Sequence, residues 1–179
     1  LGYNCGIIDL TQGELGTRGN VELRLQEADR AKGILGLDAR ENLGFADGFF
    51  QNDKAHQLEV VKMIRKYQPE IVLANSVHDR HPDHGKGAKL VADACFLAGL
   101  VKIETGQEAW RPRVIYHYIQ DEYIHPDLTI DISHYWDKKL ESIQAYTSQF
   151  YNPDSDLPDT PISGKEFLVF LEGIAAVVG

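Results

Sequence analysis

The feature that most constrains the fold is a short apolar run, followed at once by a dense polar loop and a proline. Residues 70–75 read as a buried parallel strand, because Ile71–Ala74 is apolar and begins with β-branched side chains, and a Gln68-Pro69 turn signal precedes it. Pro82 suits the first position of a helix, since its φ is already fixed and an N–H there would have no intrahelical partner. We therefore predict a helix over residues 83–98, ended by Gly99.

Other segments of the chain alternate between strand and helix patterns in the same way. Asn20 and Asp53 are suitable N-caps for two of the predicted helices. The predicted strands are 3–10, 40–43, 113–119 and 128–132, and the predicted helices are 21–35, one beginning after Asp53, 134–147 and 163–177. This alternation predicts an α/β fold, a Rossmann-like three-layer α/β/α sandwich with a mostly parallel sheet. A chain of 179 residues fits a single domain.

Polar side chains concentrate in three of the predicted strand-to-helix loops. The first loop holds Glu14 and Arg18, the second holds Asp47, and the third is the run from His78 to His84. Right-handed crossovers place all such loops on one rim of a parallel sheet, where open α/β sheets bind their ligands. We therefore expect a functional cleft at this rim.

The third loop offers the side chains that a catalytic metal site needs. His81 and His84 are three residues apart at a helix start, so they can face the same space. Imidazoles with nearby carboxylates suit Zn²⁺, which keeps one open position in catalytic sites, and His84 is the candidate ligand. Asp83 could fix the tautomer of His81, which would then act as an acid or stabilise an oxyanion. The alternative is a solvated His-rich surface loop.

Composition excludes several other functions. The 18 basic and 27 acidic residues give a net charge of −9 with no local basic cluster, so nucleic acid and anionic membranes are not expected partners. No apolar run reaches the ~20 residues that span a bilayer, and no signal peptide is visible. Cys5 and Cys95 read as small buried hydrophobes in a reducing compartment, which makes the cytoplasm the expected location. Neither a P-loop nor a Gly-x-Ser-x-Gly elbow is present.

Several segments together resemble one known family. They are Thr11–Gly19, Arg24–Glu27, Leu43–Phe50 and His81–His84, followed by Thr129–Ser133 with Trp136 and Lys139. In this order they are similar to the PIG-L/LmbE-like zinc N-deacetylases, most of all to the deacetylases of bacillithiol biosynthesis that act on N-acetylglucosaminyl malate. The resemblance covers nearly the whole chain.

The resemblance implies roles for individual residues. His84 would be a zinc ligand, and His81 would stabilise the oxyanion or protonate the leaving amine, with Asp83 tuning it. Arg80 would help to shape the acetyl pocket. The residues expected to bind substrate are Arg24 and Asp47 by the resemblance, and Arg18 and Glu14 by their place in the first loop. The alternatives are a solvated helix residue for Arg24 and a turn former for Asp47.

The chain departs from the family at both ends. By the same resemblance, two zinc ligands and the general base belong to an Ala-His-Pro-Asp-Asp motif after the family's first strand, and residues 1–179 lack it. Leu1-Gly2 reads like the end of a helix with its glycine stop. We expect that the first strand and helix and a C-terminal segment are missing, and that the chain as given is inactive.

The function implied is zinc-dependent hydrolysis of the N-acetyl group of an N-acetylglucosaminyl small molecule, with N-acetylglucosaminyl malate as the preferred substrate. Two alternatives stay open. One is a deacetylase or amidase for another N-acyl amino sugar or conjugate. The other is a non-catalytic α/β module that binds a nucleotide at the same rim. A homo-oligomeric state is also open.

Overall fold

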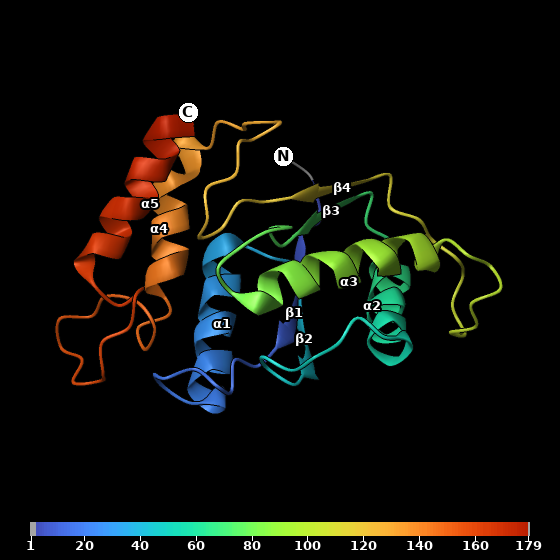
Figure 1. The fold of residues 1–179 in the computed structure, drawn as a ribbon, viewed down its shortest axis with the longest axis horizontal. Coiled ribbons are helices and arrows are strands. Elements are labelled where there is room, and N and C mark those ends of the chain that lie inside the picture. Colours follow the sequence, from blue (N-terminus) through green and yellow to red (C-terminus); the bar gives the residue numbers. More distant parts are fainter. Residues whose placement is uncertain (1–2, 179) are drawn as a thin grey trace. The chain divides into compact units, whose positions relative to one another are not determined.

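A computed structural model describes residues 3–178, so the predicted helix end at Leu1-Gly2 lies outside the described residues. The chain divides into two compact units. The outer unit comprises Leu1–Gly44 with Pro126–Gly179, and the middle unit comprises Phe45–His125. Both combine strands with helices, which confirms the α/β class (Figure 1). The three-layer arrangement and the single domain stay predictions.

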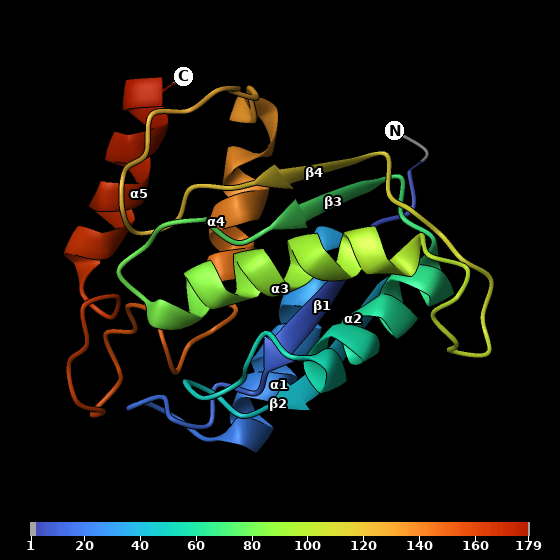
Figure 2. The same cartoon turned by 45° about the vertical axis from the view of Figure 1, so that its right-hand side comes forward.

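The middle unit is built on two parallel strands and two long helices. Strand β3 (Ile71–Ala74) pairs with β4 (Val114–His117), with Ile71 opposite Val114 and Ala74 opposite His117. Their arrows point the same way in Figure 2. Helices α2 (Lys54–Tyr67) and α3 (Pro82–Ala98) pack against each other, and α3 also contacts β3. The core consists of Phe45, Phe50, Val60, Val61, Ile64, Ala74, Ala88, Leu90, Ala94, Cys95 and Ala98.

Local sequence signals determine where both helices begin. The Asp53 carboxylate caps α2 by accepting from the N–H groups of Ala55 and His56, as predicted. Pro82 is the first residue of α3, and the His81 ring caps the helix. The buried Arg65 of α2 donates to the carbonyl oxygens of Ala98, Leu100 and Ile103. The Ala98 and Leu100 carbonyls also accept from the N–H groups of Trp110 and Ile103, so Arg65 adds a second donor there and ties the end of α3 to the segment that follows it.

The outer unit contains the other sheet and three α-helices. Strand β1 (Gly6–Thr11) pairs with β2 (Ala39–Phe45), whose last residue falls in the middle unit. Helix α1 (Val21–Leu35) has the predicted bounds, with Asn20 as N-cap and Gly36 at φ 68° after its end. It packs against α4 (Trp136–Gln144), which follows the 3₁₀ turn η1 (Ser133–Tyr135). Helix α5 (Lys165–Val178) is the last element, and the Phe150 and Phe167 rings stack at 5.6 Å.

Three predictions about strands and burial are wrong. Residues 128–132 form no strand: Leu128 and Ile130 are exposed, and apolar alternation gives no ladder without a partner strand. Strand β3 is not fully buried, because Ile71 is 50% and Leu73 is 66% exposed. Its burial alternates along the strand, so one face is covered and the other is open. Cys5 lies before β1 and is exposed, whereas Cys95 is buried as predicted.

Among residues 3–178, none of the helices combines the length and the apolarity that crossing a bilayer requires.

Candidate active site

The loop between β3 and α3 presents two stacked imidazole rings. Ser76 is buried in this loop, and its Oγ donates to the carbonyl of His78 at 2.6 Å, which fixes the path of the chain before α3. His81 then caps the helix and His84 lies in its first turn. Their ring centroids are 5.0 Å apart with 27° between the planes. The prediction that both histidines face the same space is confirmed.

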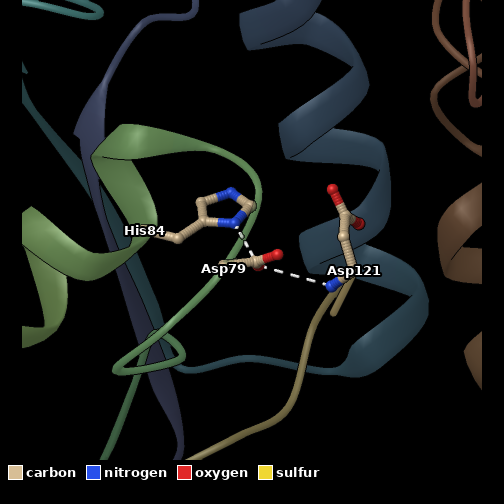
Figure 3. A group of neighbouring side chains, drawn as sticks. All are labelled: Asp79, His84 and Asp121. Carbon is tan, nitrogen blue, oxygen red and sulfur yellow. Dashed lines mark hydrogen bonds and ion pairs between the residues drawn. The ribbon is translucent and has the colours of Figure 1, made fainter. Parts of the chain in front are cut away.

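Hydrogen bonds on both ring nitrogens determine the tautomer of His84. Its Nδ1 lies 2.6 Å from Asp79 Oδ2, and its Nε2 lies 3.3 Å from Gln120 Nε2 (Figure 3 shows the Asp79 contact). The Gln120 oxygen accepts from Asn75 Nδ2 and from the N–H of Ser76, so the Gln120 amide nitrogen is the group that faces His84. The proton of His84 is therefore on Nδ1, and Nε2 carries the lone pair that a metal requires.

Asp79 orients His84. Its side chain is fully buried, and its Oδ1 accepts from the N–H groups of Arg80 and Glu122. Its Oδ2 accepts from His84 and from the N–H of Asp121 at 3.3 Å. Burial acts to raise the pKa of Asp79, but these hydrogen bonds outweigh it and lower the pKa. With both oxygens engaged twice, the carboxylate holds the imidazole in place and has no lone pair left for a metal.

Asp121 completes a three-residue cluster. One potential ligand atom each of Asp79, His84 and Asp121 lies within 4.8 Å of the other two. Asp121 is already paired, since its Oδ2 accepts from Arg80 Nη2 at 2.7 Å. Asp79 is saturated and Asp121 is paired with Arg80, so His84 Nε2, whose hydrogen bond from Gln120 is 3.3 Å long, is the atom of the cluster best placed to bind a metal. The described residues thus supply one histidine ligand with an orienting carboxylate, which fits one of the three protein ligands of a catalytic zinc site.

The structure places the Asp83 carboxylate differently from the prediction. It accepts from the N–H of Gly48 at 2.7 Å and pairs with Lys86 Nζ at 2.7 Å. Burial acts to raise the pKa of Asp83, and the contacts with Lys86 and Gly48 lower it overall. The tautomer of His81 is instead fixed by the backbone N–H of Asp83, which donates to His81 Nδ1 at 3.2 Å. The proton of His81 is therefore on Nε2.

The predicted substrate residues lie in both units. Asp47 is half-buried in the turn before Gly48, so the Gly48–Asp83 hydrogen bond ties this turn to the start of α3. In the outer unit, Arg24 Nη1 donates to Gln149 Oε1 at 3.0 Å, so Arg24 is not merely solvated. Arg18 is buried and Glu14 is exposed.

The sequence reasoning missed Asp79, Gln120 and Asp121 as site residues. Asp79 could have been found, because it lies in the same polar run as His84 and is five residues before it. Gln120 and Asp121 follow β4, which pairs in parallel with β3. The carboxyl ends of adjacent parallel strands lie at the same edge of a sheet. The position of Gln120 and Asp121 just after a predicted strand could therefore have placed them near His84.

These observations indicate a candidate metal site. An unprotonated imidazole nitrogen, oriented by a carboxylate beyond the end of a parallel strand, can serve as a metal ligand. The comparisons with known proteins give the family. The chain belongs to the PIG-L family, described as GlcNAc-PI de-N-acetylase, whose model matches residues 1–95 and so includes His81–His84.

A solved structure and three curated proteins are similar to the chain. The conserved protein TT1542 from Thermus thermophilus is 38% identical, with a TM-score of 0.80 over 83% of this chain and 68% of that chain. Diacetylchitobiose deacetylase from Thermococcus kodakarensis is 29% identical over 81% of this chain. A probable N-acetyl-alpha-D-glucosaminyl L-malate deacetylase 2 from Bacillus anthracis is 28% identical over 88% of this chain and 72% of that protein.

The third curated protein has a different reaction. The 4-oxalmesaconate hydratase from Pseudomonas putida is 27% identical over 83% of this chain and 64% of that protein. The chain spans 56% of the Thermococcus deacetylase. The similar proteins are named for different reactions, so family membership alone does not identify the reaction of this chain.

Proposed function

We propose that this chain contributes to the zinc-dependent hydrolysis of the N-acetyl group of an N-acetylglucosaminyl small molecule. N-acetylglucosaminyl malate, as in bacillithiol biosynthesis, is the preferred substrate. The observation that carries the proposal is His84, whose Nδ1 is bonded to buried Asp79 and whose Nε2 is left as an acceptor. The named deacetylases among the relatives support the reaction class.

His84 would hold zinc through Nε2, with Asp79 maintaining its tautomer. When bound, zinc supplies a water of lowered pKa and polarises a carbonyl oxygen. His81 stacks on His84, and its Nε2–H would donate to the acetyl oxygen as negative charge develops there. The same proton could pass to the leaving amine.

The other predicted site residues have supporting roles in this proposal. Asp83 fixes His81 through its backbone N–H and anchors the Asp47–Gly48 turn through its carboxylate. Arg80 is paired with Asp121 beside His84, which supports a role in shaping the acetyl pocket. Substrate binding by Arg24, Asp47, Arg18 and Glu14, a cytoplasmic location and a homo-oligomeric state stay predictions.

Two histidine substitutions test the proposal. In a longer form of the protein that also carries the expected Ala-His-Pro-Asp-Asp motif, His84→Ala should abolish zinc binding measured by elemental analysis, and with it acetate release. In the same form, His81→Ala should keep zinc but lower the rate of acetate release by about 10²–10⁴-fold. His78→Ala is a matched control, because His78 lies in the same loop and its side chain is 80% exposed and pairs with Glu122, away from both His81 and His84 rings. Full zinc occupancy in His84→Ala would show that the metal assignment is wrong.

A second candidate reaction is the addition of water to an unsaturated dicarboxylate or tricarboxylate, which the identity to the Pseudomonas hydratase favours. Assays on an acetylated glucoside and on an enol or alkene acid separate the two, because only the first substrate releases acetate. Turnover of the acid alone would replace the deacetylase proposal.

A further inference from the structure

A cavity of about 420 Å³ lies within the outer unit, beside the beginning of α5. Its lining includes Arg18 from the first loop, Ser155 and Asp159 from the segment between α4 and α5, and Lys165 and Glu166 from the first turn of α5. Because all of these residues belong to the outer unit, the cavity is formed without any residue of the His81–His84 loop. In the function proposed above Arg18 is a predicted substrate-binding residue, and the other lining residues have no role.

Arg18 is the buried cation of this cavity. Its side chain is only 4% exposed, and its Nη2 donates to Ser155 Oγ, a neutral acceptor, at 2.5 Å. Its Nε is buried and has no hydrogen-bond partner among the described residues. A guanidinium removed from water and left without a counter-charge is costly, so such a group normally has an anion to bind. The unpaired Nε–H of Arg18 can therefore donate to an anion, which the described residues do not supply.

The backbone around Arg18 is held firmly in place. Gln149 Nε2 donates to the Arg18 carbonyl oxygen at 2.7 Å. Gly19 has φ +72°, and a Cβ there would lie 2.9 Å from Ser148 Oγ, so only glycine allows this close approach. Ser148 in turn donates through its N–H and Oγ to Glu27, which is fully buried. This support positions the guanidinium in advance, as a binding site requires.

The rim of the cavity favours a single anionic group. Lys165 is exposed at the start of α5, with its Nζ 5.0 Å from the centre of the Tyr151 ring. The amino end of this 14-residue helix adds partial positive charge on the same side. Asp159 and Glu166 are exposed on the rim. These carboxylates would repel a second negative group, while they could accept hydrogen bonds from hydroxyl or amino groups.

We propose that this cavity binds the carboxylate or phosphate group of a small molecule. Arg18 is the buried partner of the anion, and Lys165 with the start of α5 is the partner at the rim. The rest of the ligand carries hydrogen-bond donors that face Asp159 and Glu166. No residue of His81–His84 lines this cavity, and the proposal rests on Arg18 and Lys165, so it does not depend on the deacetylase assignment.

Calorimetric titration with inorganic phosphate and with acetate tests the proposal and distinguishes the two anions. We expect saturable binding of at least one of them. Arg18→Gln should weaken that binding about tenfold or more, because it removes a charge-assisted contact. Lys165→Glu should weaken it several-fold by reversing the charge at the rim. Arg113→Gln is the control, because Arg113 is an exposed arginine that does not line the cavity.

Three outcomes would overturn the proposal. The first is the absence of saturable binding of either anion by the unmodified chain. The second is unchanged affinity in Arg18→Gln, with circular dichroism confirming that it is folded. If Arg18→Gln does not fold, the anion affinities of Arg18→Lys and Lys165→Glu are measured instead. Unchanged affinity in Lys165→Glu then overturns the proposal. The third is loss of binding in His84→Ala, which would place the anion at the metal site. Retained binding in His84→Ala, even if that variant proves the metal assignment wrong, leaves the cavity proposal standing.

Discussion

Replacing Asp79 by asparagine should weaken metal binding although no ligand is changed. The carboxylate accepts from four donors, two on each oxygen, and the shortest contacts are 2.6 Å to His84 Nδ1 and 2.7 Å to the N–H of Arg80. An asparagine has one oxygen, and it can serve either the Arg80 and Glu122 N–H groups or His84. If it serves the backbone, its NH₂ group faces His84 Nδ1. The ring then moves its proton to Nε2, which is the atom that zinc needs.

The expected loss of zinc affinity in Asp79→Asn follows from the hydrogen bonds that the carboxylate makes. A group that hydrogen-bonds a metal-binding histidine typically contributes about 10–100-fold to metal affinity, or about 1.4–2.7 kcal/mol. The free energy of unfolding should also fall by about 2–3 kcal/mol, since a charge-assisted hydrogen bond is worth about 1.5–3 kcal/mol and a backbone N–H loses its partner. Competition with a chromophoric chelator measures the zinc affinity, and urea unfolding of the metal-free chain measures the stability.

Asp121→Asn is the matched control for this prediction. It removes the other carboxylate of the cluster but leaves the hydrogen bond between Asp79 and His84 intact. We expect Asp121→Asn to bind zinc within about threefold of the unmodified chain, well below the loss of about 10–100-fold expected for Asp79→Asn. Zinc affinity unchanged in Asp79→Asn would refute the tautomer argument. A large loss in Asp121→Asn alone would show that Asp121 is a ligand.

Three further predictions concern stability and reactivity. Cys5 is exposed, whereas burial raises the pKa of Cys95 to about 11, so a thiol reagent at pH 8 should label Cys5 alone in the folded chain and both cysteines in urea. The pKa of Asp83 is lowered in the folded state, so its stabilising contribution is complete above the ordinary value of about 3.9 and is lost as pH falls through the folded value. Urea unfolding of Asp83→Asn should therefore show its largest deficit near pH 6 and a shrinking deficit below pH 4, and a deficit independent of pH would contradict this. Arg65→Met should lower the free energy of unfolding by about 2–3 kcal/mol, because it removes charge-assisted hydrogen bonds to the Ala98, Leu100 and Ile103 carbonyls, of which the first two keep a backbone donor; a change below 1 kcal/mol in urea unfolding would contradict this.

Local signals in the sequence predicted the helices well. Asn20 with Gly36 gave both ends of α1, and Asp53 and Pro82 gave the starts of α2 and α3. Each of these residues acts through its own backbone or its immediate neighbours, so a single sequence contains the whole interaction. Strands lack such signals, because the partner strand decides whether they form. Residues 128–132 alternate as a strand should, yet they form no strand.

In the candidate site too, contacts between neighbours in the sequence were predicted, and contacts between distant residues were not. His81 and His84 were predicted together because their spacing at a helix start fixes their proximity. Gln120 is 36 residues from His84 and reaches it only because β4 pairs in parallel with β3. The carboxylate of Asp83 was expected to meet His81, but Lys86 is one turn along α3 and the Gly48 N–H comes from another loop. Competition among partners for one carboxylate cannot be read from spacing.

The geometry of His81 bears on what reaction this chain supports, since its relatives include both deacetylases and a hydratase. His81 Nδ1 accepts a hydrogen bond from the N–H of Asp83, so the ring proton lies on Nε2. A proton on Nδ1 would point at that N–H and repel it. A fixed N–H suits a reaction in which negative charge develops on oxygen, since the oxygen accepts a hydrogen bond that strengthens as the charge grows. Addition of water to a double bond conjugated with a carboxylate or ketone also builds negative charge on an oxygen, so a fixed N–H would serve that reaction too. The held tautomer of His81 therefore supports an oxyanion-stabilising role in either reaction, and the release of acetate is what separates the two.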